Sequence, residues 1–220
     1  MKCEMMNRDE IDHCRENIRM AAGIRAATIK SILRIRRNKM TIAKNQWENA
    51  RNRALALFEK AKIVVTEDEK AHFEVADFGL NELERFGLEL VIYVNTDRCC
   101  AKEMALFPGQ ICPEHRHPPV AGGPGKEETF RCRWGEVYLY VEGTSTEQIK
   151  GAIPQGKEDC FTVFHEIILR PGQQYTLRPN MLHWFQAGPD GAVVSEFSTH
   201  SSDETDIFTD PRIKRTPSIN

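Results

Sequence analysis

The chain has no run of apolar residues that approaches the roughly 18 needed to cross a bilayer. Its first residues are polar and lack the apolar stretch of a signal peptide. It also lacks a charge excess, since 30 Lys and Arg stand against 32 Asp and Glu. The overall charge therefore favours neither a nucleic-acid nor a membrane surface. We expect a soluble, cytoplasmic protein with no nucleic-acid or membrane partner.

Cysteine is present, but not in the patterns that mark a disulfide framework or a zinc site. The seven cysteines are odd in number, include no C-x-x-C pair, and contain an adjacent Cys99-Cys100. Such a set indicates a reducing compartment. Internal repeats are absent too, and 220 residues suffice for one sizeable core with an appendage.

The pattern of apolar residues divides the chain into a helical part and a strand-rich part. Residues 1–62 show helical spacing, with a break at Gly23 and a further helix over about Ile42 to Lys62. Residues 63–220 carry short β-type runs separated by Asn, Gly and Pro, including a predicted turn at Gly188–Gly191. We therefore predict a mainly β barrel or sandwich with an N-terminal α-helical extension that packs on it.

The first 60 residues are basic, with 14 basic against 7 acidic side chains. A cluster between Arg25 and Lys39 could contact DNA, because phosphate binding needs grouped cations. The cluster has no interleaved aromatic residues and no helix-turn-helix sequence. A solvated helix face or a subunit contact is therefore the favoured interpretation.

Four residues in the strand-rich part have the types and positions of metal ligands. His115 and His117 lie two apart, so an extended segment projects both imidazoles from one face. Glu128 begins or precedes a predicted strand, and His183 begins another. Three imidazoles and one carboxylate suit Mn²⁺, Fe²⁺, Co²⁺, Ni²⁺ or Zn²⁺, and a six-coordinate ion keeps two positions for substrate oxygens. The alternative is that these histidines are ordinary polar residues at turn–strand junctions.

This pattern resembles the two signatures of the cupin superfamily. Gly109, His115, His117, Glu128 and Gly135 match the first signature, with ten residues between His117 and Glu128 where three or four are usual. The resemblance implies a double-stranded β-helix (jelly-roll) barrel. Because cupins host many activities, the fold alone does not decide the function.

A narrower resemblance is to the D-lyxose isomerase family. It is carried by three segments: Gly125–Phe130, Arg178–Phe185, and Val194–Ser198 followed by Asp203–Asp206. The family implies a metal-dependent aldose–ketose isomerase, converting D-lyxose to D-xylulose and D-mannose to D-fructose through a metal-stabilised cis-enediolate. It also implies Mn²⁺ as the first choice of metal.

The proton-transfer base is predicted to be Glu196, because Val194, Glu196 and Ser198 share one strand face and a carboxylate inside a barrel is partly desolvated. Lys126 and Asp206 match family residues as well. The resemblance implies that Lys126 polarises a hydroxyl or enediolate oxygen, and that Asp206 binds sugar hydroxyls or orients the base. If these side chains face outward, all three are merely solvated residues.

Two other functions remain open from the sequence: an Fe²⁺-dependent cupin dioxygenase and a sugar-sensing DNA-binding regulator. The complete ligand set counts against the regulator. We also expect a homodimer, since antiparallel barrels with a helical arm commonly pair.

Overall fold

The computed structural model describes residues 41–120, 122–215 and 218–219. The helices predicted before residue 40 lie outside this part of the chain. Residues Met40–Asn220 form one compact unit. Within the described residues, no helix combines the length and hydropathy that a membrane-spanning segment needs.

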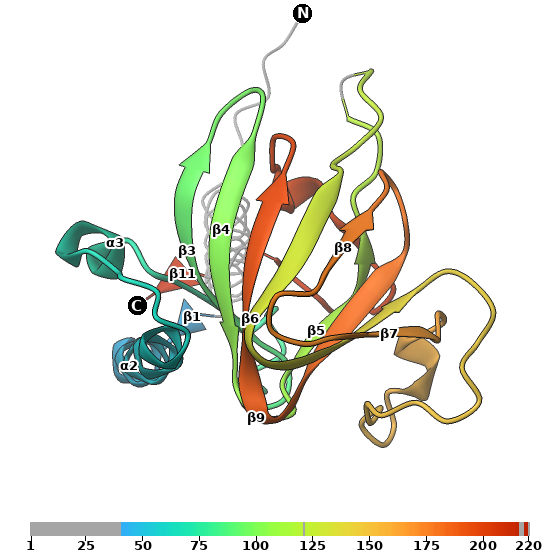
Figure 1. Cartoon of the computed structure of the whole chain (residues 1–220), viewed down its shortest axis with the longest axis horizontal. Helices are drawn as coiled ribbons and strands as arrows, with labels where there is room; N and C mark the ends of the chain where they lie inside the picture. Colours follow the sequence, from blue (N-terminus) through green and yellow to red (C-terminus); the bar gives the residue numbers. More distant parts are fainter. Residues whose placement is uncertain (1–40, 121, 216–217, 220) are drawn as a thin grey trace, which may run out of the picture. The chain divides into compact units, whose positions relative to one another are not determined.

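Strands dominate the compact unit, and two helices lie beside them (Figure 1). The strands are β1 (Thr41–Ile42), β2 (Glu74–Ala76), β3 (Leu88–Asn95), β4 (Cys100–Leu106), β5 (Ile111–Arg116), β6 (Glu128–Val141), β7 (His165–Leu169), β8 (Gln174–Leu177), β9 (His183–Ser198), β10 (Ile207–Phe208) and β11 (Ser218–Ile219). The helices are α2 (Lys44–Lys60) and α3 (Glu67–Ala71), with 3-10 turns η1 (Glu158–Cys160) and η2 (Asp203–Thr205).

The large sheet curls because its longest strand, β9, pairs with three other strands. One path through it runs β10-β5-β9-β4-β3-β2, while β6 pairs with β7, β8 and β9. Strand β9 thus contacts β5 near its start, β4 near its end and β6 along most of its length. The pairs between the strands of this sheet are antiparallel, and the predicted mainly β barrel is confirmed.

The predicted turn at Gly188–Gly191 is wrong, because β9 runs through it. Opposite this segment, the pairing of β6 and β9 jumps from Gly135↔Ala192 to Val137↔Ala187, so several residues of β9 face a single residue of β6. Gly135 has φ +74, and a Cβ there would lie 2.1 Å from the Gly191 carbonyl oxygen. The glycines therefore form a bulge that bends β9 between its two sheet partners.

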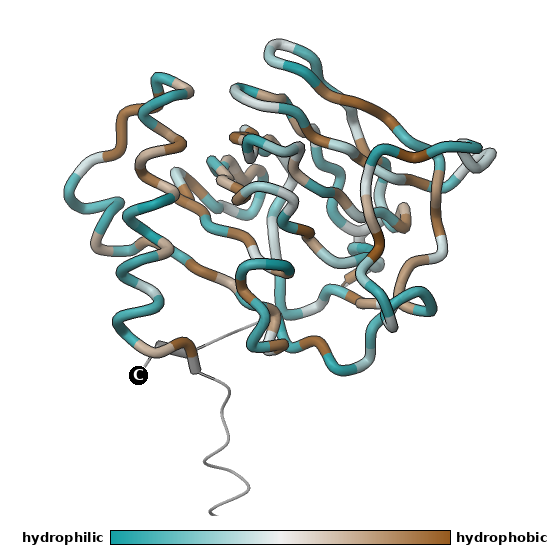
Figure 2. The backbone as a smooth tube through the Cα atoms, turned by 90° about the horizontal axis from the view of Figure 1, so that it is seen from below, coloured by the Kyte–Doolittle hydropathy of each residue, from teal (hydrophilic) through white to brown (hydrophobic). Residues whose placement is uncertain are grey.

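Helix α2 covers the outside of the sheet, as its apolar spacing predicted. Its buried residues pack against Val75, Val91 and Val193 in a second core, distinct from the core inside the barrel. The tube in Figure 2 changes repeatedly between apolar and polar residues, as expected where successive residues of a strand point to opposite faces of a sheet. Helix α3 was not predicted, although Thr66 and Glu69 form the capping box that could have revealed it.

Candidate functional site

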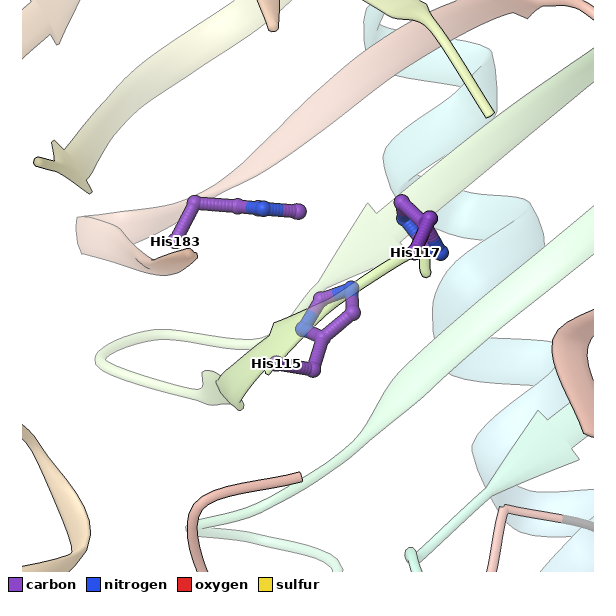
Figure 3. A group of neighbouring side chains, drawn as sticks. All are labelled: His115, His117 and His183. Carbon is purple, nitrogen blue, oxygen red and sulfur yellow. The ribbon is translucent and has the colours of Figure 1, made fainter. Parts of the chain in front are cut away.

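Three histidines converge inside the barrel. His115 lies near the end of β5 and His117 just beyond it, while His183 opens β9 and pairs with His115 across the ladder. One ring nitrogen from each lies within 4.8 Å of the others, and all three side chains are buried. Figure 3 shows the three rings facing a common space. These are the three histidines that the sequence predicted to converge.

The hydrogen bonds of each imidazole determine which nitrogen can bind a cation. The Nδ1 atom of His115 donates to the Pro113 carbonyl (2.8 Å), and that of His183 donates to the Met181 carbonyl (2.9 Å). The Nδ1 atom of His117 donates to Asp206 Oδ1 (2.5 Å). A carbonyl or carboxylate can only accept, so the proton lies on Nδ1 and the Nε2 lone pair remains for a metal.

Glu128 brings a carboxylate to the same nitrogens. Its Oε1 atom lies 3.0 Å from His117 Nε2 and 3.1 Å from His183 Nε2. Within the described residues, His183 Nε2 is buried and makes no well-aligned hydrogen bond despite this approach. A lone pair so close to a carboxylate oxygen is repelled unless a cation lies between them. The residues present therefore fit a divalent cation.

The electrostatics of the cluster favour a neutral imidazole at His115 and a charged one at His117. Burial, together with His183 and His117, lowers the pKa of His115 well below its usual value. Burial also lowers the pKa of His117, but Glu128 and Asp206 outweigh it and raise the pKa to about 9. A proton or a metal cation on His117 Nε2 would thus satisfy the same two carboxylates.

Lys126 connects Glu128 to Glu196. Its Nζ atom lies 2.7 Å from Glu128 Oε2 and 2.6 Å from Glu196 Oε1, and all three side chains are buried. Burial alone would lower the pKa of Lys126, but the two carboxylates raise it well above the usual value. The structure thus places Glu196 and Lys126 inside the barrel beside the histidines, rather than in solvent.

Asp206 contacts His117 through Nδ1, so its observed contact is with a histidine of the cluster. Such a carboxylate fixes the orientation of the ring and makes it a better ligand. Its other implied role, binding of sugar hydroxyls, stays a prediction.

Three further charged residues at the site were not predicted. Lys102 on β4 lies 3.2 Å from both Asp203 oxygens and 3.9 Å from Glu196, and Arg215 pairs with Asp203 (2.8 Å). Lys102 alternates with Cys100 and Met104 on one strand face, so a lysine within an apolar alternation was the available signal. Asp203 and Arg215 follow β9 in irregular segments, where periodicity carries no information.

Most of these residues line a small cavity. One wall is charged and contains the residues described above except His183. The other is apolar and includes Phe78, Leu90, Phe130 and Phe208. One charged wall and one apolar wall suit a small polar ligand.

The long spacer between His117 and Glu128 leaves the ligand set intact because its ends lie together. A Cβ on Gly125, which has φ +95, would lie 2.4 Å from the His117 carbonyl oxygen. The chain thus leaves the barrel after His117 and returns beside it. The excursion lines a second groove that also contains Lys126 and Asp206.

Comparison with known proteins agrees with this arrangement. The sequence pattern of a family described as D-lyxose isomerase matches residues 45–220. A D-lyxose/D-mannose isomerase of Thermosediminibacter oceani is 61% identical over 178 residues, which are 81% of this chain and 98% of that protein. A D-lyxose ketol-isomerase of Thermofilum sp. is 60% identical and covers 81% and 99%.

Among solved structures, the L-ribose isomerase of Cellulomonas parahominis without ligand superposes with a TM-score of 0.69. Its sequence identity is 17%, over 83% of this chain and 100% of that chain. This likeness supports the fold.

Proposed function

The chain belongs to the D-lyxose isomerase family, and on that premise we propose that it converts D-lyxose to D-xylulose and D-mannose to D-fructose. Membership makes the protein an isomerase. The relatives' names, D-lyxose/D-mannose isomerase and D-lyxose ketol-isomerase, support these two sugars. The preference between them belongs to the proposal.

One observation carries the proposal: a buried carboxylate, Glu196, is joined through Lys126 to a carboxylate of the histidine cluster, Glu128. Aldose–ketose exchange needs a base beside a site that stabilises negative charge on two neighbouring oxygens. In this proposal Glu196 is the base and the histidine cluster with Glu128 is the site that stabilises the charge, and Lys126 contacts both carboxylates.

His115, His117, Glu128 and His183 would hold the cation, with Mn²⁺ as the proposed metal. Fe²⁺, Co²⁺, Ni²⁺ and Zn²⁺ accept the same donors. A divalent cation bound there supplies positive charge next to the substrate oxygens.

The chain's own residues then move the proton. Glu196 takes the proton from C2 of the aldose, which leaves a cis-enediolate, and returns this proton to C1, while the hydroxyl proton of O2 passes to O1. The ketose therefore forms without net oxidation. The Lys126 ammonium donates a hydrogen bond to the oxygen that gains charge. Asp206 keeps the His117 ring oriented, and the apolar wall excludes water, which strengthens each of these interactions.

The test is an aldose panel assayed after the metal has been removed with a chelator and after reconstitution. We expect activity to disappear on removal and to return with Mn²⁺, with D-lyxose and D-mannose as the best substrates. Undiminished activity in protein shown to be metal-free would overturn the metal assignment. Inactivity on every aldose after reconstitution would overturn the isomerase assignment.

The other two functions weighed from the sequence are not favoured by family membership. An Fe²⁺ dioxygenase would consume oxygen, whereas the proposed isomerase works anaerobically. A DNA-binding role would rest on the basic stretch between Arg25 and Lys39, which lies outside the described residues.

A homodimer and a cytoplasmic location complete the proposal. The five cysteines within the described residues are all free, which supports a reducing compartment. Light scattering on the purified protein tests the dimer, and a monomeric mass would overturn it. Cell fractionation tests the location.

A further inference from the structure

The charged wall and the apolar wall of the cavity both extend away from the histidines. On the apolar side, the Phe208 ring stacks on His115 with centroids 5.2 Å apart, and the Phe78 ring lies 5.8 Å beyond Phe208. On the charged side, Lys102 and Asp203 lead to Arg215. The Arg215 guanidinium lies 6.0 Å from the Phe78 ring centre, so the two walls meet there.

Arg215 is held firmly in this position. Its two terminal nitrogens pair with Glu74 (2.6 Å) and Asp203 (2.8 Å), and its side chain is 9% exposed. The cavity therefore extends from the histidines and Glu196 toward Phe78 and Arg215.

Phe78 adopts a backbone conformation that phenylalanine rarely takes. Its φ is +54, and Gly79 beside it has φ +70. The Leu80 N–H donates to the Asp77 carbonyl (3.0 Å), so Phe78 and Gly79 are the central residues of a turn of the type I′ class. Asn, Asp or Gly usually fills the first of these positions, and a bulky residue there is an outlier.

The surroundings hold this strained turn in place. Asp77 Oδ1 accepts from the Gly79 N–H (2.9 Å), and the Phe78 carbonyl accepts from the Lys214 N–H (2.8 Å). The Phe78 side chain is 1% exposed and lines the cavity. Strain of this kind persists where the rest of the structure imposes it, and it clusters at functional sites.

We infer that Phe78 is a specificity-determining residue, whose ring forms the end wall that limits the length of the sugar. This rests on the proposed isomerase function and deepens it. A sugar bound with C1 and C2 beside the histidines and Glu196 points its last carbon toward Phe78. D-Mannose has the C2 to C4 configuration of D-lyxose and is longer by one carbon at the end near Phe78. The wall therefore contacts the carbon that D-mannose has and D-lyxose lacks.

The experiment measures kcat/KM for D-lyxose and D-mannose in the Mn²⁺-reconstituted wild type and in three variants. Phe78→Leu and Phe78→Ala have smaller side chains at the wall and leave more room for the last carbon of the sugar. We expect the ratio of kcat/KM for D-mannose to kcat/KM for D-lyxose to rise at least about tenfold, because one carbon in an apolar pocket commonly changes kcat/KM by this factor. Phe78→Trp lengthens the wall and lowers the ratio. Because Phe78→Trp removes no volume, it keeps the test informative if the smaller variants fold poorly.

Phe58→Leu is the matched control. Phe58 is as deeply buried as Phe78 but belongs to the core between α2 and the sheet. This variant loses stability without changing the ratio. If the wild type is active and the ratio stays within threefold in all three Phe78 variants, the end wall is refuted while the isomerase assignment stands. If the reconstituted wild type isomerises no aldose, the proposed function itself has failed.

Discussion

The charged residues of the cavity are stabilised by alternation of sign. Acidic and basic side chains alternate along one line of ion pairs, and each lies within 4.0 Å of the next. In order they are Glu74, Arg215, Asp203, Lys102, Glu196, Lys126 and Glu128. Burying an unpaired charge costs several kcal/mol, and removing one partner from a buried pair commonly costs about 3–5 kcal/mol. A substitution that keeps the shape of the side chain and removes only its charge, such as Glu→Gln or Asp→Asn, therefore disturbs the fold least.

Glu196→Gln removes the proposed base while keeping its volume. We expect kcat to fall by about 10²–10⁴-fold, the contribution typical of a general base, with the fold and metal content unchanged. Steady-state kinetics with D-lyxose and metal analysis measure this. Glu103→Gln is the control, because Glu103 is also buried but bonds to Ser195 (2.7 Å) and does not line the cavity. Near wild-type exchange in Glu196→Gln would remove Glu196 from the mechanism.

Asp206→Asn separates the two roles open to Asp206. The amide oxygen can still accept from His117 Nδ1 but carries no charge, so the ring becomes a weaker ligand. We expect Mn²⁺ affinity to fall about 10–100-fold, measured by competition with a chelating dye. Asp210→Asn, which loosens a pair with Arg212 in the same part of the chain, leaves the affinity unchanged. A raised KM for sugar with unaltered Mn²⁺ affinity would show that Asp206 binds substrate instead.

At the scale of the element, periodicity and ligand spacing predicted those features that depend on residues close in the sequence, such as where strands begin. Strands begin at Glu128 and His183 as expected, since alternation and turn residues act locally. The run of β9 through Gly188–Gly191 could not be predicted, because it depends on β6 lying opposite with its own glycine. The charge pairs of Lys102 and Arg215 depend on tertiary structure in the same way.

The bulge that bends β9 gives a prediction about Gly135. Gly135→Ala places a Cβ against the Gly191 carbonyl and also forces φ +74 on alanine. We expect the free energy of unfolding to fall by more than about 2 kcal/mol, measured by urea denaturation. Gly172→Ala is the control, since Gly172 has φ +89 but open space around it. That variant should lose only about 1–2 kcal/mol, from φ alone.

The difference between the two glycine variants isolates the steric contact inside the bulge. Equal losses in Gly135→Ala and Gly172→Ala would mean that the strands separate at little cost. The bend of β9 would then not depend on the close approach of Gly135 and Gly191.

At the scale of the whole molecule, stability depends on pH through acids whose pKa values are shifted in opposite directions. For Asp203, burial raises the pKa, but Arg215 and Lys102 outweigh it and lower the pKa below its usual range. This group stabilises the fold above its unfolded pKa, and that contribution is lost in acid. Glu89 behaves in the opposite way, since burial raises its pKa well above the usual value, only partly offset by Gln110.

Glu89 lies on β3, fully buried, where Gln110 Nε2 donates to its Oε1 (3.2 Å) and Oε2 has no partner within the described residues. Its folded-state pKa exceeds the unfolded value of about 4.3, so its contribution is fully present below that pH and is lost as pH rises toward the folded pKa. Glu89→Gln cannot lose a proton. We therefore expect the variant to match the wild type near pH 4 and to be more stable at pH 7.

The gap between the two proteins should widen by at most about 1.4 kcal/mol per pH unit, the limit for one proton. Urea unfolding of both proteins from pH 4 to pH 8 measures it. The acid-sensitive groups, Asp203 among them, are common to both and cancel in the difference. A gap that stays constant with pH would mean that Glu89 has the same pKa in the folded and the unfolded protein, and that the charge of Arg53 and the Gln110 hydrogen bond offset its burial completely.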